Sequence, residues 1–249
     1  MENYVETAYS DWIYQPHIRE KVAHKTFLEE GPIVLNRLEN EEYLQSPLFR
    51  QVLHLCETVR NAGSVKLTAI GNLPLKIVRE VYKLGVSDSY YEKYPTKLTT
   101  ENDSITVQTA RLVAEMGGLV KIRGKALSIT VKGKKCLGNY PLLMESILVT
   151  YGHKLSWGYF DGYENKMVGQ YGFGLSLLLL ANYGNETRDS KFYSERYLFY
   201  NQRLSWYEKA HHAYTVRTLA RFLTYLGLVN YKEERKYMLE EHETVSKSD

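Results

Sequence analysis

The chain is poor in the features that mark secreted, membrane-spanning or metal-binding proteins. Its 249 residues include two cysteines, Cys56 and Cys136, which are too few for a disulfide framework and lack metal-site spacing. Its most apolar stretch, Phe173–Ala181, is far too short to cross a bilayer. The opening residues show neither a basic segment nor an apolar core, so we expect no signal peptide. These absences favour a cytoplasmic protein with two buried free thiols and no membrane contact.

Catalytic and cofactor-binding motifs are also missing. No P-loop, paired-carboxylate motif or Ser-His-Asp order stands out. The glycine-rich run Gly169–Gly174 has no strand before it, as a dinucleotide loop requires, and is better explained by helix packing. His211 and His212 are neighbours that point in different directions on a helix, and His17 and His24 have no third partner. The sequence therefore predicts no enzyme, no cofactor and no metal.

Charge is unevenly distributed along the chain. The net charge is +3, but residues 1–59 carry 5 basic and 10 acidic side chains, and residues 139–249 carry 13 of each. Residues 60–138 carry 14 basic and 6 acidic side chains, a balance of +8. Only this middle third has the electrostatics to attract a polyanion. The 22 tyrosines could stack on bases, but packing by these large amphipathic rings is the favoured interpretation.

One motif occurs twice, 109 positions apart. The first copy, Thr106–Val120, reads T-V-Q-T-A-R-L-V-A-E-M-G-G-L-V, and the second, Thr215–Val229, reads T-V-R-T-L-A-R-F-L-T-Y-L-G-L-V. In each copy a helical stretch ends at a glycine and a β-rich segment follows. The repeat predicts two related units. We expect the chain to divide into an N-terminal helical segment (1–60), a first unit (61–138) and a helical region with a second unit (139–249).

A hairpin after the first motif is the clearest local prediction. Residues 119–123 and 126–130 are strand-like, and Gly124-Lys125 between them suits a type II′ turn. Alternation sends two sets of side chains to opposite faces. The inward set is Val120, Ile122, Leu127 and Ile129, and the set in water is Lys121, Arg123 and Lys125.

Capping residues and apolar spacing predict the helices. Ser46, Asn72 and either Asp103 or Ser104 are expected N-caps, the last for the first motif helix. Beyond Asn139 we expect helices over about 141–151, 172–183, 190–201 and 214–226. Strands at 227–231 and 235–239, with a turn over 232–234, should follow, and residues 240–249 should carry no element. The fold class is mostly α with small β-hairpins.

The order of a helix, a Thr-Val-containing helix, a Gly-Leu-Val strand, a basic turn and a strand ending in Thr resembles winged-helix repressors of the multiple-antibiotic-resistance type. The copy at Thr106–Thr130 is the better match. The resemblance implies tandem winged-helix-like units. It also implies DNA binding, because the third helix of such a unit often enters a groove.

A second resemblance is more specific. Leu67–Pro74, L-T-A-I-G-N-L-P, is similar to the L-T-x-x-G-N-L-P signature of a group of bacterial proteins, some associated with plasmids or mobile elements. In them the signature precedes a helix-hairpin unit that ends in L-T-x-x-G, which here reads Ile129-Thr-Val-Lys-Gly133. This match implies the fold unit and a bacterial source, and it brings no activity.

We therefore expect a transcriptional or mobile-element regulator that binds duplex DNA. Exposed positions of the first motif helix would face the groove, where Gln can pair with adenine and Arg with guanine or phosphate. The hairpin cations and the basic stretch after it would follow the backbone. The expected contact residues are Thr106, Gln108, Thr109, Arg111, Lys121, Arg123, Lys125, Lys132, Lys134 and Lys135.

Two alternatives remain open. The second motif helix could make a secondary backbone contact through Arg217, Thr218 and Arg221, although Glu233 and Glu234 in its turn disfavour this. The whole scaffold could instead serve protein contacts, with the tyrosine-rich C-terminal half pairing with a partner or a second copy.

Overall fold

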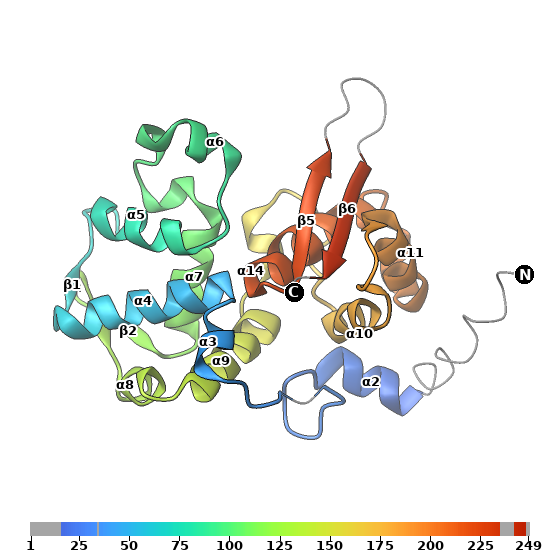
Figure 1. Ribbon diagram of the computed structural model, residues 1–249, viewed down its shortest axis with the longest axis horizontal. Coiled ribbons are helices and arrows are strands. Elements are labelled where there is room, and N and C mark those ends of the chain that lie inside the picture. Colours follow the sequence, from blue (N-terminus) through green and yellow to red (C-terminus); the bar gives the residue numbers. More distant parts are fainter. Residues whose placement is uncertain (1–15, 34, 235–241, 248–249) are drawn as a thin grey trace, which may run out of the picture.

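The protein is mostly helical and carries two small antiparallel sheets, as Figure 1 shows for this computed structural model. The structure describes residues 16–33, 35–234 and 242–247. The predicted fold class, mostly α with small β-hairpins, is confirmed. In Figure 1 the two sheets lie in opposite halves of the molecule, with helix α9 (Tyr140–Val149) between the halves.

The first half is built on three longer helices and a three-stranded sheet. In chain order these elements are α4 (Pro47–Asn61), β1 (Val65–Lys66), α5 (Leu75–Leu84), α7 (Ile105–Met116), β2 (Val120–Arg123) and β3 (Ala126–Ile129). The strands lie in the order β1-β3-β2. Helix α4 packs against α5, α7 and β3, so packing groups it with residues 61–138 rather than with residues 1–60. We call residues 47–129 the first unit.

Local capping explains where these helices begin. The Ser46 hydroxyl accepts a hydrogen bond from the Phe49 N–H at 3.4 Å, with Pro47 in the first turn, as predicted. Ser104, rather than Asp103, caps α7 by accepting from the Val107 N–H at 3.4 Å. The predicted Asn72 cap is wrong, because α5 begins after Pro74 and no side chain caps it.

A long connection crosses the start of α7. It contains α6 (Ser89–Lys93) and the short 3-10 helices η1 (Pro95–Lys97) and η2 (Glu101–Asp103). After β3 the chain forms α8 (Val131–Leu137), α9 and the π-helical turn η3 (Thr150–Lys154). Helix α9 packs against α4 and α8, and η3 packs against α7, so the end of α7 is covered on this side.

The second half repeats the element order of the first. Its elements are α10 (Phe173–Tyr183), β4 (Arg188–Asp189), α11 (Ser190–Tyr200), α12 (Gln202–Ser205), the continuous helix α13-η5-α14 (Ala210–Tyr214, Thr215–Leu223, Thr224–Leu226), β5 (Val229–Glu234) and β6 (His242–Lys247). The strands lie in the order β4-β6-β5. As in β1-β3-β2, the last strand of the chain order lies between the other two. We call residues 173–247 the second unit.

The second hairpin differs from its prediction. The turn expected at 232–234 is wrong, because β5 continues through Glu234 and pairs with His242 there. The strand expected at 235–239 lies outside the described residues. A strand, β6, occupies 242–247, where no element was expected. The cause is the polar composition of this segment, which carries no alternating apolar face to signal a strand.

The two motif copies end at equivalent glycines. Gly118 has φ +71° and Gly227 has φ +77°, a left-handed conformation that side chains with a Cβ disfavour. In both copies the first strand of the hairpin begins two residues after this glycine, at Val120 in β2 and at Val229 in β5. The shared glycine therefore turns each motif helix into its first hairpin strand.

Aromatic packing dominates the core of the second half. The Trp157 and Phe222 rings stack with centroids 4.3 Å apart, and Tyr197 and Tyr214 lie 4.5 Å apart. Tyr193, Tyr197 and Tyr214 are each no more than 1% exposed, so these tyrosines pack as predicted. The N-terminal helix α2 (Pro16–His24) packs against α10, and α3 (Asn40–Tyr43) packs against α9. Among the described residues, no helix has the length and apolar character needed to span a bilayer.

Candidate nucleic-acid interface

Strand register gathers three cations on the outer face of the first sheet. Lys66 and Arg123 both pair with Ala126, from opposite sides, and Lys121 pairs with Ser128. Paired residues point to the same face, and residues two apart in one strand do as well. The other face carries Val65 and Leu127, which are buried against the helices, whereas Ile122, expected to point inward, is 49% exposed. We call the surface formed by Lys66, Lys121 and Arg123 the basic face.

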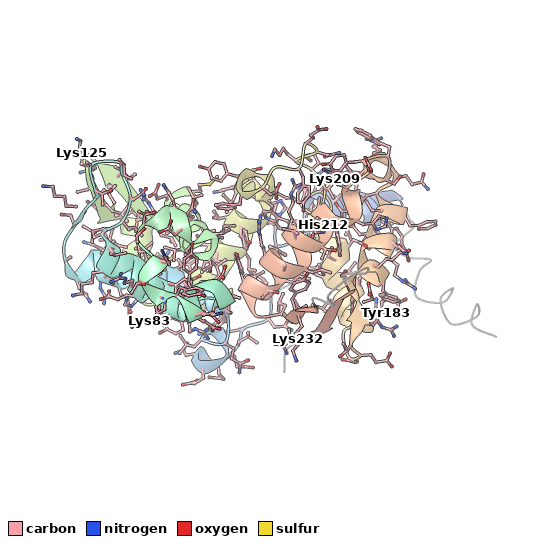
Figure 2. The ribbon with its side chains drawn as sticks, turned by 90° about the horizontal axis from the view of Figure 1, so that it is seen from above. Lys83, Lys125, Tyr183, Lys209, His212 and Lys232 are labelled. Atoms are coloured by element: carbon pink, nitrogen blue, oxygen red, sulfur yellow. The ribbon has the colours of Figure 1, made fainter. Side chains whose placement is uncertain are left out.

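The basic face is exposed and lacks carboxylate partners. Lys66, Lys121 and Arg123 are all exposed, and none makes an ion pair or side-chain hydrogen bond with another described residue. Lys125 lies in the adjoining turn, and Figure 2 shows it at the outer tip of the molecule, at the opposite end from Tyr183. Like charges gathered without counter-charges repel each other, so the approach of an anion lowers the electrostatic free energy of this surface.

The basic stretch continues into α8. Residues 116–144 contain six basic side chains and no acidic one. Lys134 and Lys135 are exposed, as predicted. Lys132 differs, because its ammonium donates a hydrogen bond to the Gly117 carbonyl at 2.7 Å and so closes the end of α7. Among the predicted contact cations of the hairpin and α8, Lys132 is the one whose side chain already has a partner within the part of the chain that the structure describes.

The first motif helix does not present the side chains expected of a base-reading helix. The expectation that Thr106, Thr109 and Arg111 are exposed is wrong, because they are 6%, 1% and 8% exposed. The Thr106 hydroxyl donates to Gln51 of α4 at 2.9 Å. Gln108 is half-buried, and its amide donates to the Asn102 carbonyl at 3.2 Å.

Arg111 instead ties α7 to two other segments. Its guanidinium donates to Glu101 at 2.6 Å, to Glu115 at 2.7 Å and to the Gly71 carbonyl at 2.9 Å. Burial by itself would lower the pKa of Arg111, but the hydrogen bond to Glu115 and the charges of Glu101 and Glu115 outweigh burial and raise it. Glu101 also accepts from the Leu73 N–H at 2.7 Å. The arginine is therefore a structural clamp, and its predicted contact with bases has no geometric basis.

The second motif helix holds an even more enclosed arginine. Arg217 is fully buried and makes a two-point ion pair with Asp161, at 2.8 Å from Nε and 2.7 Å from Nη2. Its remaining nitrogen donates to the carbonyls of Asn165 and Val168, at 2.7 and 3.0 Å. Burial by itself would raise the pKa of Asp161, but the hydrogen bonds and charge of Arg217 outweigh burial and lower it.

The predicted secondary contact is thus largely internal. Thr218 is fully buried, and Arg221 is half-buried with its guanidinium 3.4 Å from Asp161. The segment 157–170, which begins with the 3-10 helix η4 (Trp157–Phe160), supplies every partner of Arg217 named above. This segment covers the start of the second motif helix, so Arg217 and Thr218 have no access to a groove.

The corresponding face of the second sheet is not basic. The motif alignment pairs Val120 with Val229, so Asn230 and Lys232 occupy the positions of Lys121 and Arg123. Lys232 pairs with Thr244, which pairs with Asp189 on its other side, so Asp189 corresponds to Lys66. Three cations in the first unit are therefore replaced by one cation, one amide and one carboxylate.

Lys66 is the exposed cation of the basic face that sequence reasoning missed. The sequence predicts an extended conformation for residues 65–67. It does not show which strand so short a segment pairs with, because that depends on residues distant in the chain. Pairing with Ala126 places Lys66 level with Arg123, two strands away. Two strand spacings amount to roughly 10 Å, which allows both cations to reach one polyanion.

The two cysteines lie in the interior of the protein. Cys56 and Cys136 are buried free thiols, as predicted, and burial raises the pKa of Cys56 to about 12. Such a thiol is protonated at neutral pH and is a poor nucleophile. Within residues 16–33, 35–234 and 242–247, no group of three His, Cys, Asp or Glu side chains is arranged to hold a metal ion.

No family model, curated protein or solved structure matches this chain. The arrangement of its own residues is therefore the basis for a functional assignment.

Proposed function

We propose that the protein binds duplex DNA through the basic face and the Lys125 turn, with Lys134 and Lys135 as flanking contacts. The observation that carries the proposal is the set of three exposed, unpaired cations on one face of the β1-β3-β2 sheet. The element order of the first unit, with a hairpin after its third helix, supports a winged-helix unit whose hairpin is the wing. The same order in the second unit supports a tandem arrangement.

The proposed contact is with phosphates rather than base edges. Thr106, Thr109 and Arg111 are buried, and Thr106 and Arg111 also have partners inside the protein, so α7 has little with which to read bases. Cations that contact the backbone supply affinity and register but little sequence information. A transcriptional or mobile-element role, in the cytoplasm of a bacterium, would therefore depend on DNA shape or on a partner for its specificity.

Salt dependence gives the first test. If four cations each neutralise one phosphate, the logarithm of the binding constant falls with the logarithm of salt concentration with a slope of about −4. Fluorescence anisotropy with a labelled random duplex, titrated over roughly 50 to 200 mM salt, measures this slope. A slope near zero, or no binding at the lowest salt, would refute the proposal.

The two sheets provide a matched pair of variants. Lys121→Glu/Arg123→Glu reverses two charges on the basic face, and Asn230→Glu/Lys232→Glu changes the equivalent positions of the second sheet. All four side chains are exposed, so folding should be retained. We expect the first variant to weaken duplex binding roughly 100-fold and the second to change it only a few-fold. Equal losses would show that general charge, rather than this face, drives binding.

Exposed aromatic side chains favour a second candidate, a protein-contact role for the C-terminal half. Phe199 and Trp206 are 59% and 75% exposed, although both are large apolar groups. A second copy of the chain is the simplest partner for such a surface. Light scattering of wild-type protein and of Trp206→Asp tests this role, since a dimer that persists in the variant would exclude this face as the contact.

A further inference from the structure

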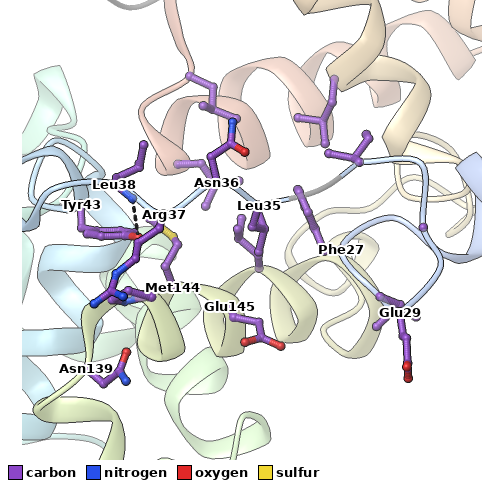
Figure 3. A pocket seen from close by; sticks show the side chains of 18 of the residues that line it. Phe27, Glu29, Leu35, Asn36, Arg37, Leu38, Tyr43, Asn139, Met144 and Glu145 are labelled. Atoms are coloured by element: carbon purple, nitrogen blue, oxygen red, sulfur yellow. Dashed lines mark hydrogen bonds between the residues drawn. The ribbon is translucent and has the colours of Figure 1, made fainter.

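A large cavity lies between residues 27–33 and 35–43, here called the crossing segment, and helix α9. Its volume is about 1050 Å³, within the general size range of small-molecule sites. Figure 3 shows the segment crossing above α9, with Phe27 toward one end and Tyr43 toward the other. Leu226 and Leu228, at the end of the second motif helix and the start of β5, also line the cavity. The N-terminal segment, α9 and the second half of the molecule therefore contribute to its walls.

The floor of the cavity is apolar. Met144 and Leu148 of α9 and Leu177 of α10 face it, together with Phe27 and Leu226. Several apolar side chains of the crossing segment stay partly in water, with Leu35 38% exposed and Leu38 42% exposed. An apolar ligand would cover such surface and remove it from water, which is the usual source of affinity in sites of this kind.

Hydrogen-bond donors gather at one end of the cavity. Arg37 makes no ion pair or side-chain hydrogen bond with any residue that the structure describes, and Figure 3 shows it beside Tyr43 and Met144. The Tyr43 hydroxyl accepts from the Leu38 N–H at 3.0 Å, which leaves its own O–H free to donate. Asn139 accepts from the Leu142 N–H at 3.1 Å through its carbonyl oxygen, so its amide N–H groups remain as donors.

The other end of the cavity is acidic. Glu29 and Glu30 line it, and Figure 3 shows Glu29 beyond Phe27, far from Arg37. Glu145 also belongs to the lining, but Figure 3 shows its carboxylate pointing away from the crossing segment. The cavity therefore has a polarity along α9, with a cation and two neutral donors at the N-terminal end of the helix and carboxylates at the far end.

We propose that this cavity binds a monocarboxylate with an unbranched apolar chain. The carboxylate accepts hydrogen bonds from Arg37, with Tyr43 and Asn139 as the neighbouring donors, because a guanidinium fits a carboxylate in two-point geometry. The chain lies along Met144 and Leu148 toward Phe27. From Asn139 to Leu148 the helix rises roughly 14 Å, so a chain of medium length fills the floor. Glu29 and Glu30 disfavour a second carboxylate and fix the orientation.

Calorimetry of the full-length protein with three probes tests this inference without DNA, so its outcome is separate from that of the proposed DNA contact. The probes are decanoate, decanol and decylammonium, which share a chain and differ in the head group. We expect decanoate to bind about tenfold or more tightly than decanol, and decylammonium to bind most weakly. Decylammonium binding as tightly as decanoate, or none of the three binding, would overturn the proposal.

Two substitutions locate the site. Arg37→Gln, at an exposed position, should weaken decanoate binding about tenfold and leave decanol binding unchanged, while Arg60→Gln, an exposed arginine outside the cavity, should alter neither. Met144→Trp should fill the floor and remove binding of all three probes, with circular dichroism as the check on folding. Decanoate binding that is insensitive to Arg37→Gln would place the carboxylate elsewhere and contradict the assignment.

Discussion

The two units share a backbone plan but differ in what they show to solvent. Both contain a helix, a short strand, two further helices and a hairpin, with the same strand order. The first sheet presents Lys66, Lys121 and Arg123, whereas the second presents Asp189, Asn230 and Lys232 at equivalent positions. Side chains on the outer face of a sheet do not pack in the core, so the same backbone plan can occur twice with different surface charges. The comparison teaches that a shared strand order does not determine the charge that a sheet presents.

The motif helices differ in how their arginines are neutralised. Arg111 has two carboxylates, Glu101 and Glu115, whereas Arg217 shares the single carboxylate of Asp161 with Arg221. Removing one acid should therefore affect the units unequally, and the following predictions use that inequality, beginning with the largest effect.

Asp161→Asn should destabilise the protein far more than Glu101→Gln. The first change leaves the fully buried Arg217 without a counter-charge, which costs about 3 to 5 kcal/mol. After Glu101→Gln, Arg111 keeps Glu115, and the loss should be about 1 to 2 kcal/mol. Urea unfolding followed by tryptophan fluorescence measures both. As a control, the double variant Asp161→Leu/Arg217→Met should lose less free energy of unfolding than Asp161→Asn. Equal losses for Asp161→Asn and Glu101→Gln would contradict the comparison.

Acid should weaken the Asp161 pair. The pKa of Asp161 is lower in the folded protein than its ordinary value of 3.8, so its contribution to stability is complete above that value. The contribution is lost as the pH falls through the lowered pKa. We expect the free energy of unfolding to drop below about pH 4 in wild-type protein, with a smaller drop in Asp161→Asn. Identical pH profiles for the two proteins would show that Asp161 stays ionised throughout.

The two motif glycines should respond differently to alanine. Both have left-handed backbones, which cost a residue with a Cβ about 1 to 2 kcal/mol. A Cβ at Gly118 meets open space, whereas one at Gly227 would lie 3.1 Å from the Gln45 carbonyl and 3.2 Å from Pro47. Thermal unfolding should therefore rank Gly227→Ala below Gly118→Ala in stability. The reverse ranking would mean that the Gln45–Pro47 turn gives way without cost.

Exchanging one pair of equivalent residues should separate position from net charge. Lys121→Asn/Asn230→Lys moves a cation from the first sheet to the second and leaves the net charge of the chain unchanged. We expect duplex binding to weaken about fivefold, because one phosphate contact is lost. Anisotropy at low salt measures this small effect, and each single variant serves as a control. Unchanged affinity would indicate that the two sheets bind DNA equally.

Local features of the fold were readable from the sequence. Ser46 and Ser104 cap helices through hydrogen bonds that span three residues, and the 119–130 hairpin is set by a glycine turn and alternating side chains. These signals act within one turn of helix or one hairpin. The exposed hairpin cations followed from the same alternation.

Features that depend on distant partners were not readable. Arg217 and Thr218 stand at polar positions of an amphipathic helix, where solvent exposure is the usual outcome. Their burial depends on Asp161 and the segment around it, which lie more than fifty residues earlier. Glu101 likewise looked like a nearby surface acid until the fold placed it on Arg111. Long-range ion pairs therefore enclose Arg111 and Arg217, two of the helix residues that were expected to face DNA.

The enclosed guanidinium of Arg217 also has a dynamic consequence. Lifting the segment 157–170 off the second motif helix separates Arg217 from Asp161. The same movement breaks the hydrogen bonds from Arg217 to the carbonyls of Asn165 and Val168. Partial opening is therefore unfavourable, and the segment and the helix should open in a single cooperative event. Amide hydrogens on both elements should then exchange with deuterium at one common rate, slower than those of the solvent-facing turn at Lys125.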